Sequence, residues 1–193
     1  MRTEFEPIIE VTQFKGDSET HPLISPDDSY ANFERGWFDT LNRARDDSLG
    51  VKIDKAERSH ARSVLKKGLT IKKEFGVNPF KFGVIGSTDT HTGLSTAEED
   101  NFWGKMAYEE PSQYRAMGMT MNMGASGLAA VWATENTRES IFASIRRKEV
   151  YATTGTRISL RFFGGWSFTK TDIDKANFAE IGYQKGVPMG GDL

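Results

Sequence analysis

Apolar runs and periodic apolar positions alternate along the first half of the chain. Residues 6–14 (EPIIEVTQF) cluster isoleucine and valine beside other β-forming residues and predict a buried strand. Residues 81–87 (KFGVIGS) predict a second strand. Between them, residues 54–76 show helical spacing, with an Asp and a Glu three apart at the start and a glycine at the end. This order of strand, helix and strand predicts α/β architecture with a mainly parallel sheet.

The remaining segments, residues 30–45 and the second half of the chain, give weaker patterns. Residues 30–45 have helical spacing, and residues 128–133 (LAAVWA) predict a strand. Asn136, with a Glu three residues later, predicts the start of a helix whose apolar residues, Ile141, Phe142 and Ile145, face the core. From residue 150 onward, β-forming residues and glycines predict β structure to the end of the chain.

Length and composition fit one soluble domain. The chain has 193 residues, of which 37% are hydrophobic and 27% are charged. The formal charge of −2 excludes a strongly basic footprint for nucleic acid or anionic lipid, so neither is expected as a partner. The sequence contains no apolar run of the roughly 18 residues that a membrane span needs, and it shows no signal-peptide pattern at its start. The sequence does not indicate in which cellular compartment the protein is found.

The chemistry available to the chain is narrow. It has no cysteine, which leaves His, Asp and Glu as the strong metal ligands. Of the three histidines, His60 lies among basic and polar residues of the predicted helix, which favours a solvated surface position. His21 and His91 each have an acidic residue two positions earlier, Glu19 and Asp89.

Both acid-x-His pairs come after a predicted strand. If the chain is extended there, residues i and i+2 point to one side, so each pair can hold a divalent metal or share a proton. Loops after parallel strands gather at the carboxyl edge of a sheet, which would bring Glu19, His21, Asp89 and His91 together as a site for Zn²⁺, Mn²⁺ or Fe²⁺. The alternatives are a plain turn after the second strand and a turn histidine before proline at His21, the latter weighing equally with a ligand role.

Longer stretches resemble a known family. KFGVIGSTDTHTG, AAVWATENTRESIFASIRRKEVYATTGTRISLRFFGGW and YQKGVPMGGDL are similar to a bacterial family of unknown function related to the PHP (polymerase and histidinol phosphatase) metallohydrolases. The resemblance implies a distorted β/α barrel with metals at the carboxyl ends of its strands and a final Asp-x-His motif, which Asp89 and His91 match. It also implies that Ser87 and Thr88, which adjoin this motif, support the ligands or bind substrate.

The segment EVTQFKGDSETHP resembles the part of the family before that final motif, which implies site contacts for Glu19 and His21 without matching either to a ligand of the family. The acid-x-His spacing is what predicts His21 as a metal ligand and Glu19 as a residue that supports the site. The opening His-x-His and further ligands of PHP proteins are absent from the sequence. The chain therefore resembles the carboxyl-terminal part of a longer protein: residues 1–150 match the late part of a barrel and residues 151–193 a β-rich tail. Exposed barrel edges then predict a homo-oligomer.

Three hypotheses follow. The first is a fragment of a metal-dependent hydrolase of phosphoesterase type, which is incomplete as a catalyst. Its substrate would be a small phosphorylated or other ester, and no residue is assigned as catalytic. The second is a non-catalytic, self-associating structural module that retains a remnant metal site. The third is a binding protein in which Trp103, Trp132 and the methionines of residues 117–123 hold an apolar ligand.

Overall fold

The computed structural model describes residues 2–33, 35, 49–91, 113 and 126–193. Most of the helix predicted over residues 30–45 lies outside the described residues, as do Trp103 and the methionines of residues 117–123. Residues 30–33, which are described, form a turn. Among the described helices, none is long and apolar enough to cross a bilayer.

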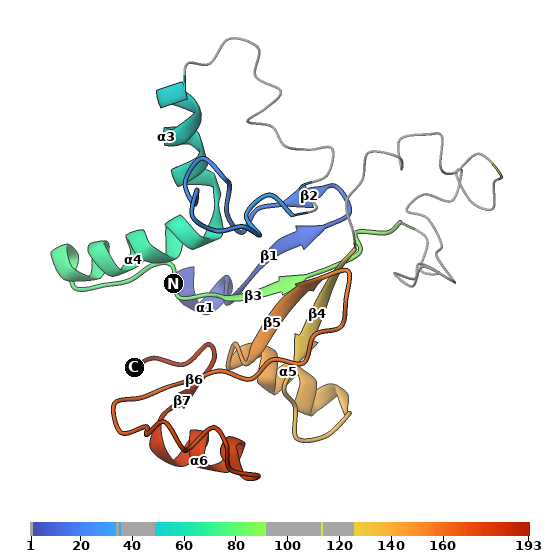
Figure 1. The fold of residues 1–193 in the computed structure, drawn as a ribbon, viewed down its shortest axis with the longest axis vertical. Helices are drawn as coiled ribbons and strands as arrows, with labels where there is room; N and C mark the ends of the chain where they lie inside the picture. Colours follow the sequence, from blue (N-terminus) through green and yellow to red (C-terminus); the bar gives the residue numbers. More distant parts are fainter. Residues whose placement is uncertain (1, 34, 36–48, 92–112, 114–125) are drawn as a thin grey trace.

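Two predicted strands form the centre of the first half (Figure 1). After a short helix, α1 (Arg2–Phe5), strand β1 (Ile8–Gln13) pairs in parallel with β3 (Gly83–Gly86), which confirms both strands. A two-residue strand, β2 (Gly16–Asp17), pairs antiparallel with β1, so the sheet order is β2-β1-β3. The parallel register shifts between Glu10 and Thr12, an irregularity of the kind that re-aims side chains near the end of a strand.

The connection between β1 and β3 contains two helices where the sequence predicted one. They are α3 (Leu49–Ser59) and α4 (Ala61–Phe75), separated by His60 in an extended conformation. Asp54 lies inside α3 and pairs with Arg58, so its predicted role as the helix cap is wrong. The predicted end is confirmed, because Gly76 adopts a left-handed conformation and its N–H closes α4 on a carbonyl of the last turn.

The predicted surface position of His60 is also wrong. The break between α3 and α4 turns its ring inward, where it is 5% exposed and its Nδ1 lies 2.8 Å from the Ala56 carbonyl oxygen. A periodicity that treats residues 54–76 as one helix places this side chain on the wrong face, because one extended residue reorients the helix that follows.

The second half begins with β4 (Gly127–Val131), α5 (Arg138–Arg146) and β5 (Val150–Thr154), and the two strands pair antiparallel. The cap of α5 is Thr137, one residue after the predicted start, and its side chain accepts a hydrogen bond from the Ser140 N–H. Phe142 is 62% exposed, so its predicted core position is wrong. The buried face of α5 is marked by Ser144, and two residues along a helix correspond to about 200°, nearly the opposite side.

The β4–β5 pair packs along β3, from Gly83, where an added Cβ would meet Val150 of β5, to Gly86, where it would meet the Leu128 backbone of β4. The hydroxyls of Thr12 and Thr154 lie 2.9 Å apart and link β1 to β5. A Cβ at Gly127 would overlap the backbone carbonyl of Thr12 and approach the Ser87 carbonyl, so the two layers meet here backbone to backbone. This contact fixes the edge of the sheet from which residues 87–91 leave.

The tail is not all β structure as predicted. It holds β6 (Phe163–Gly164), α6 (Phe178–Lys185) and β7 (Val187–Pro188), with β6 and β7 antiparallel. Buried Asp172 ties it together: the Lys185 and Lys175 ammonium groups and the Thr169 N–H bond to its carboxylate and keep its pKa well below the usual range. The helix α6 was not predicted, because two glycines near its end are unfavourable in a helix and weaken the helical pattern of the sequence.

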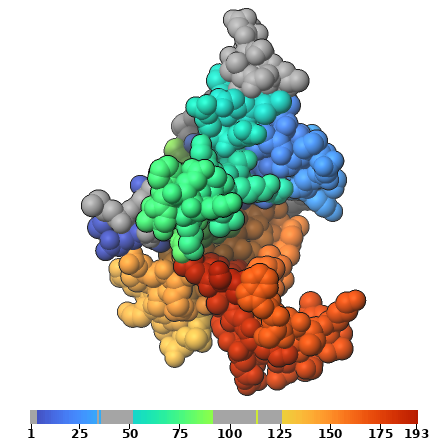
Figure 2. All heavy atoms as spheres, turned by 90° about the vertical axis from the view of Figure 1, so that its left-hand side faces the viewer, coloured from blue at the N-terminus to red at the C-terminus, as the bar shows by residue number. Residues whose placement is uncertain are grey.

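The described sheets are small, and they do not close into a barrel within the described ranges. Among the residues that the structure describes, the buried apolar side chains are correspondingly few; they are Val11, Phe14, Ala31, Ala56, Ala61, Val150 and Ile181. Figure 2 shows that α4 (green) lies on the surface of the molecule, beside the last residues of the chain (red).

Candidate metal site at the carboxyl edge of β1 and β3

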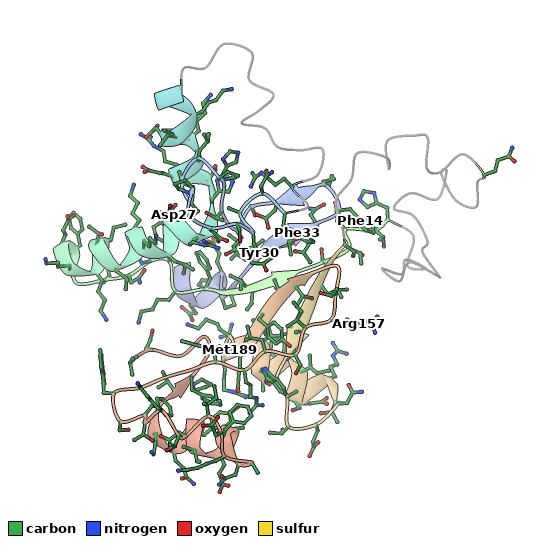
Figure 3. All side chains as sticks on the ribbon, viewed as in Figure 1. Phe14, Asp27, Tyr30, Phe33, Arg157 and Met189 are labelled. Carbon is green, nitrogen blue, oxygen red and sulfur yellow. The ribbon has the colours of Figure 1, made fainter. Side chains whose placement is uncertain are left out.

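The segment 87–91 starts where β1 and β3 both end. The Ser87 N–H donates to the Thr12 carbonyl at 3.0 Å, which extends the parallel pairing by one bond. The Ser87 hydroxyl donates to Glu10 Oε1 at 2.8 Å, so it holds a carboxylate of β1 at the same edge. Figure 3 marks Phe14 at this end of β1, near the segment that follows β3.

Asp89 shapes the turn that follows. Its φ of 51° is left-handed, a conformation that Asp tolerates better than most residues and that is enriched at functional sites. Asp89 Oδ1 lies 3.5 Å from His91 Nε2, and Asp89 Oδ2 lies 2.7 Å from Lys15 Nζ. The two predicted side chains therefore do converge, through a turn and not through the extended chain that the sequence suggested.

The distance within this pair suits a chelate. Zinc ligands lie about 2.1 Å from the ion, so two ligands at a tetrahedral angle are about 3.4 Å apart. The carboxylate oxygen of Asp89 and the imidazole nitrogen of His91 have nearly this separation. His91 is half exposed, with 52% of its side chain open to solvent, so an ion and its water could reach both atoms.

Ser87 and Thr88 do not contribute ligand atoms in this arrangement. Ser87 is engaged by Glu10, and Thr88 Oγ1 accepts a bond of 3.3 Å from the Thr90 N–H inside the turn. Both residues hold the backbone that carries Asp89. The sequence reasoning missed Glu10, although a lone carboxylate within the apolar run of β1 was a signal that could have identified it.

Glu19 and His21 have other partners. Glu19 pairs with Arg62, which also binds Asp28 at 2.8 Å, and these carboxylates raise the pKa of the Arg62 guanidinium. His21 is 3% exposed and packs edge to face on His60, with 5.7 Å between the ring centroids.

The Nδ1 atom of His21 accepts a bond of 3.0 Å from the Leu23 N–H, so a neutral ring carries its proton on Nε2. Burial also raises the pKa of nearby Asp17 to about 6. Within the described ranges no three His, Asp or Glu side chains are placed to share a metal, so Glu19 and His21 do not join Asp89 and His91 in one cluster.

Comparison with known proteins assigns a family. A model of the family described as "Protein of unknown function (DUF3604)" matches residues 1–193. No curated protein and no solved structure matches the chain. The match covers the whole chain, including the parallel strands and the Asp-x-His turn. The chain therefore belongs to the DUF3604 family.

Proposed function

We propose that this chain is part of a metal-dependent hydrolase of PHP type, in which Asp89 and His91 are ligands of a divalent ion. The observation that carries the proposal is the 3.5 Å separation of Asp89 Oδ1 and His91 Nε2 at the carboxyl ends of two parallel strands. Enzyme sites on parallel β/α folds lie at this edge. The resemblance of GSTDTHTG to the final PHP motif supports the same assignment, and with it a distorted β/α barrel as the complete fold.

The residues around the pair have complementary parts in this proposal. A bound divalent ion supplies a Lewis acid and an activated water molecule. Asp89 and His91 orient that ion, Lys15 balances the carboxylate, and Ser87 holds Glu10 as a second carboxylate that can accept a proton. Asp89 and His91 would supply two ligand atoms, and any further ligands would come from water or from the substrate. Hydrolysis of a small phosphorylated or other ester substrate fits this set.

The direct test is the metal content of the purified protein after chelation and reloading with Zn²⁺, Mn²⁺ or Fe²⁺. We expect one ion per chain in the wild type and at least a tenfold loss of affinity in Asp89→Asn and in His91→Ala, because each removes one ligand atom. Glu19→Gln is the matched control, since it changes the other acid-x-His pair, and it should bind like wild type. Equal metal content in all four proteins would reject the proposal.

A second candidate is a non-catalytic module that self-associates. The observation that favours it is the exposed apolar surface of α4 and the turn after it, where Leu69, Phe75 and Val77 are 66%, 72% and 65% exposed. A groove of about 410 Å³ runs beside Leu69 and Phe80. If copies of the chain cover this face, sedimentation should show a dimer that Leu69→Glu dissociates; a wild type that stays monomeric at tens of micromolar would exclude it.

A further inference from the structure

We infer that Lys15 is a substrate-binding residue, which receives an oxyanion of the substrate beside the ion held by Asp89 and His91. The inference rests on the proposed function and names the class of substrate that the site selects: esters with a negatively charged group next to the scissile bond. It is carried by the position of the Lys15 ammonium at the edge, 2.7 Å from Asp89 Oδ2.

Lys15 reaches this position from the turn between β1 and β2. Phe14 and Lys15 form this two-residue turn, and Gly16, the first residue of β2, pairs with Gln13, the last residue of β1. The Lys15 side chain is 34% exposed, so its ammonium lies at the boundary between protein and solvent and not in the core. A cation placed there can meet a ligand that enters from solvent.

The carboxylate of Asp89 divides its two oxygens between different partners. Oδ1 is turned to His91 Nε2, the side proposed for the metal, and Oδ2 is turned to the Lys15 ammonium. An ion on the first oxygen and the ammonium on the second therefore flank one carboxylate. A ligand oxygen bound beside such an ion would therefore lie close to the Lys15 ammonium, which contacts the other oxygen of the same carboxylate.

The charge at this edge changes sign when a divalent ion binds. Counting only the described residues bonded here, Glu10 and Asp89 carry two negative charges and Lys15 carries one positive charge, which leaves a single net negative charge. A divalent ion converts it to a single net positive charge. Asp89 would then be shared with the ion, which would leave the Lys15 ammonium available to an incoming oxyanion, because a strongly hydrated ammonium binds phosphate-like groups as a point charge.

The test is binding of inorganic phosphate to the zinc-loaded protein, measured by calorimetry, with acetate in a parallel titration to separate phosphate-like from carboxylate ligands. The variants are Lys15→Met, which keeps the aliphatic stem, Lys15→Arg, which keeps the charge, and Lys81→Met. Lys81 is the matched control, because it forms an ion pair of the same 2.7 Å length with Asp192 and has a similarly exposed side chain, at 29%.

We expect phosphate affinity to fall at least tenfold in Lys15→Met, to stay within threefold of wild type in Lys15→Arg, and to be unchanged in Lys81→Met, with equal zinc content in all. Full zinc content with unchanged phosphate affinity in Lys15→Met overturns the inference and leaves the proposed function standing. Loss of zinc in Lys15→Met also overturns it, since Lys15 would then only position Asp89. A wild type without zinc rejects the proposed function and this inference with it.

Discussion

The two acid-x-His segments of this chain have the same spacing and opposite surroundings. His21 is 3% exposed, packs against a second buried histidine, and has its acidic neighbour Glu19 tied to a helix by Arg62. His91 is half exposed, and its acidic neighbour Asp89 lies 3.5 Å away, within chelating distance. The two segments therefore share one sequence pattern. The packing around each histidine decides whether its ring stabilises the fold or is open to a ligand.

The difference follows from what comes after each segment. The backbone after β2 is bonded to the start of α4, where the Ala61 and Arg62 N–H groups donate to the Ser18 and Glu19 carbonyls. Those bonds cap the helix and draw His21 against His60. The turn at Asp89 is bonded instead to the ends of the strands, through the Ser87 N–H to the Thr12 carbonyl and the Ser87 hydroxyl to Glu10, and its His91 side chain is 52% exposed.

The largest expected effect comes from disrupting the contact of Gly127 with Thr12 and Ser87, which supports the backbone that leads to Asp89. Gly127→Ala adds a Cβ that overlaps the Thr12 carbonyl and crowds the Ser87 carbonyl, and both are backbone atoms that cannot rotate away. We expect a loss of about 3 kcal/mol or more in the free energy of unfolding, measured in urea. Gly164→Ala is the control, because its Cβ would meet only Leu193 at 3.5 Å and should change stability by less than about 0.5 kcal/mol.

Removing each histidine in turn compares the structural roles of His21 and His91 directly. His21→Ala deletes a buried ring together with its bond from the Leu23 N–H, so we expect the free energy of unfolding to fall by about 2–3 kcal/mol. His91→Ala removes an exposed ring and should cost less than about 0.5 kcal/mol. Metal affinity should show the reverse order. Similar losses of stability in both variants would mean that the two histidines have the same structural role.

The sequence predicted the elements that depend on local pattern. The strands at 6–14 and 81–87, their parallel pairing, and the helix end at Gly76 are confirmed, because apolar runs and a left-handed glycine are decided within a few residues. The proximity of Asp89 and His91 is also local, and it survives even though the chain turns there.

What the sequence could not predict depends on distant contacts. His60 was expected at the surface, yet a break between α3 and α4 and the ring of His21, thirty-nine residues earlier, bury it. The helix α6 was missed, because it is held by contacts such as that of Phe163 with Tyr183, at 5.0 Å between ring centroids, and not by strong periodicity. Individual side-chain contacts of this kind, between residues far apart in the chain, leave no pattern in one sequence, whereas the order of strand, helix and strand was enough to predict the parallel pairing.

The smallest expected effect concerns the ionisation of Asp17, which lies just before the Glu19–His21 segment. Burial raises the pKa of Asp17 from 3.8 to about 6 in the folded protein, so the native state favours the protonated carboxyl. The resulting stability is fully present below pH 4 and is lost as the pH rises through 6. The full shift corresponds to about 3 kcal/mol, which partial solvent exposure reduces to about 1–2 kcal/mol.

Asp17→Asn stays neutral and keeps an oxygen to accept the Glu19 N–H, so it should be more stable than wild type by about 1–2 kcal/mol at pH 7.5 and equal to it at pH 4. Urea unfolding across this range measures the difference. Asp192→Asn is the control of opposite sign, because Lys81 lowers the pKa of Asp192, and its contribution to stability is present at neutral pH and lost on acidification. If Asp17→Asn followed the wild-type pH profile, Asp17 would be solvated in the folded chain, and the closed surroundings attributed to the Glu19–His21 segment would begin only at Thr20, which is 2% exposed.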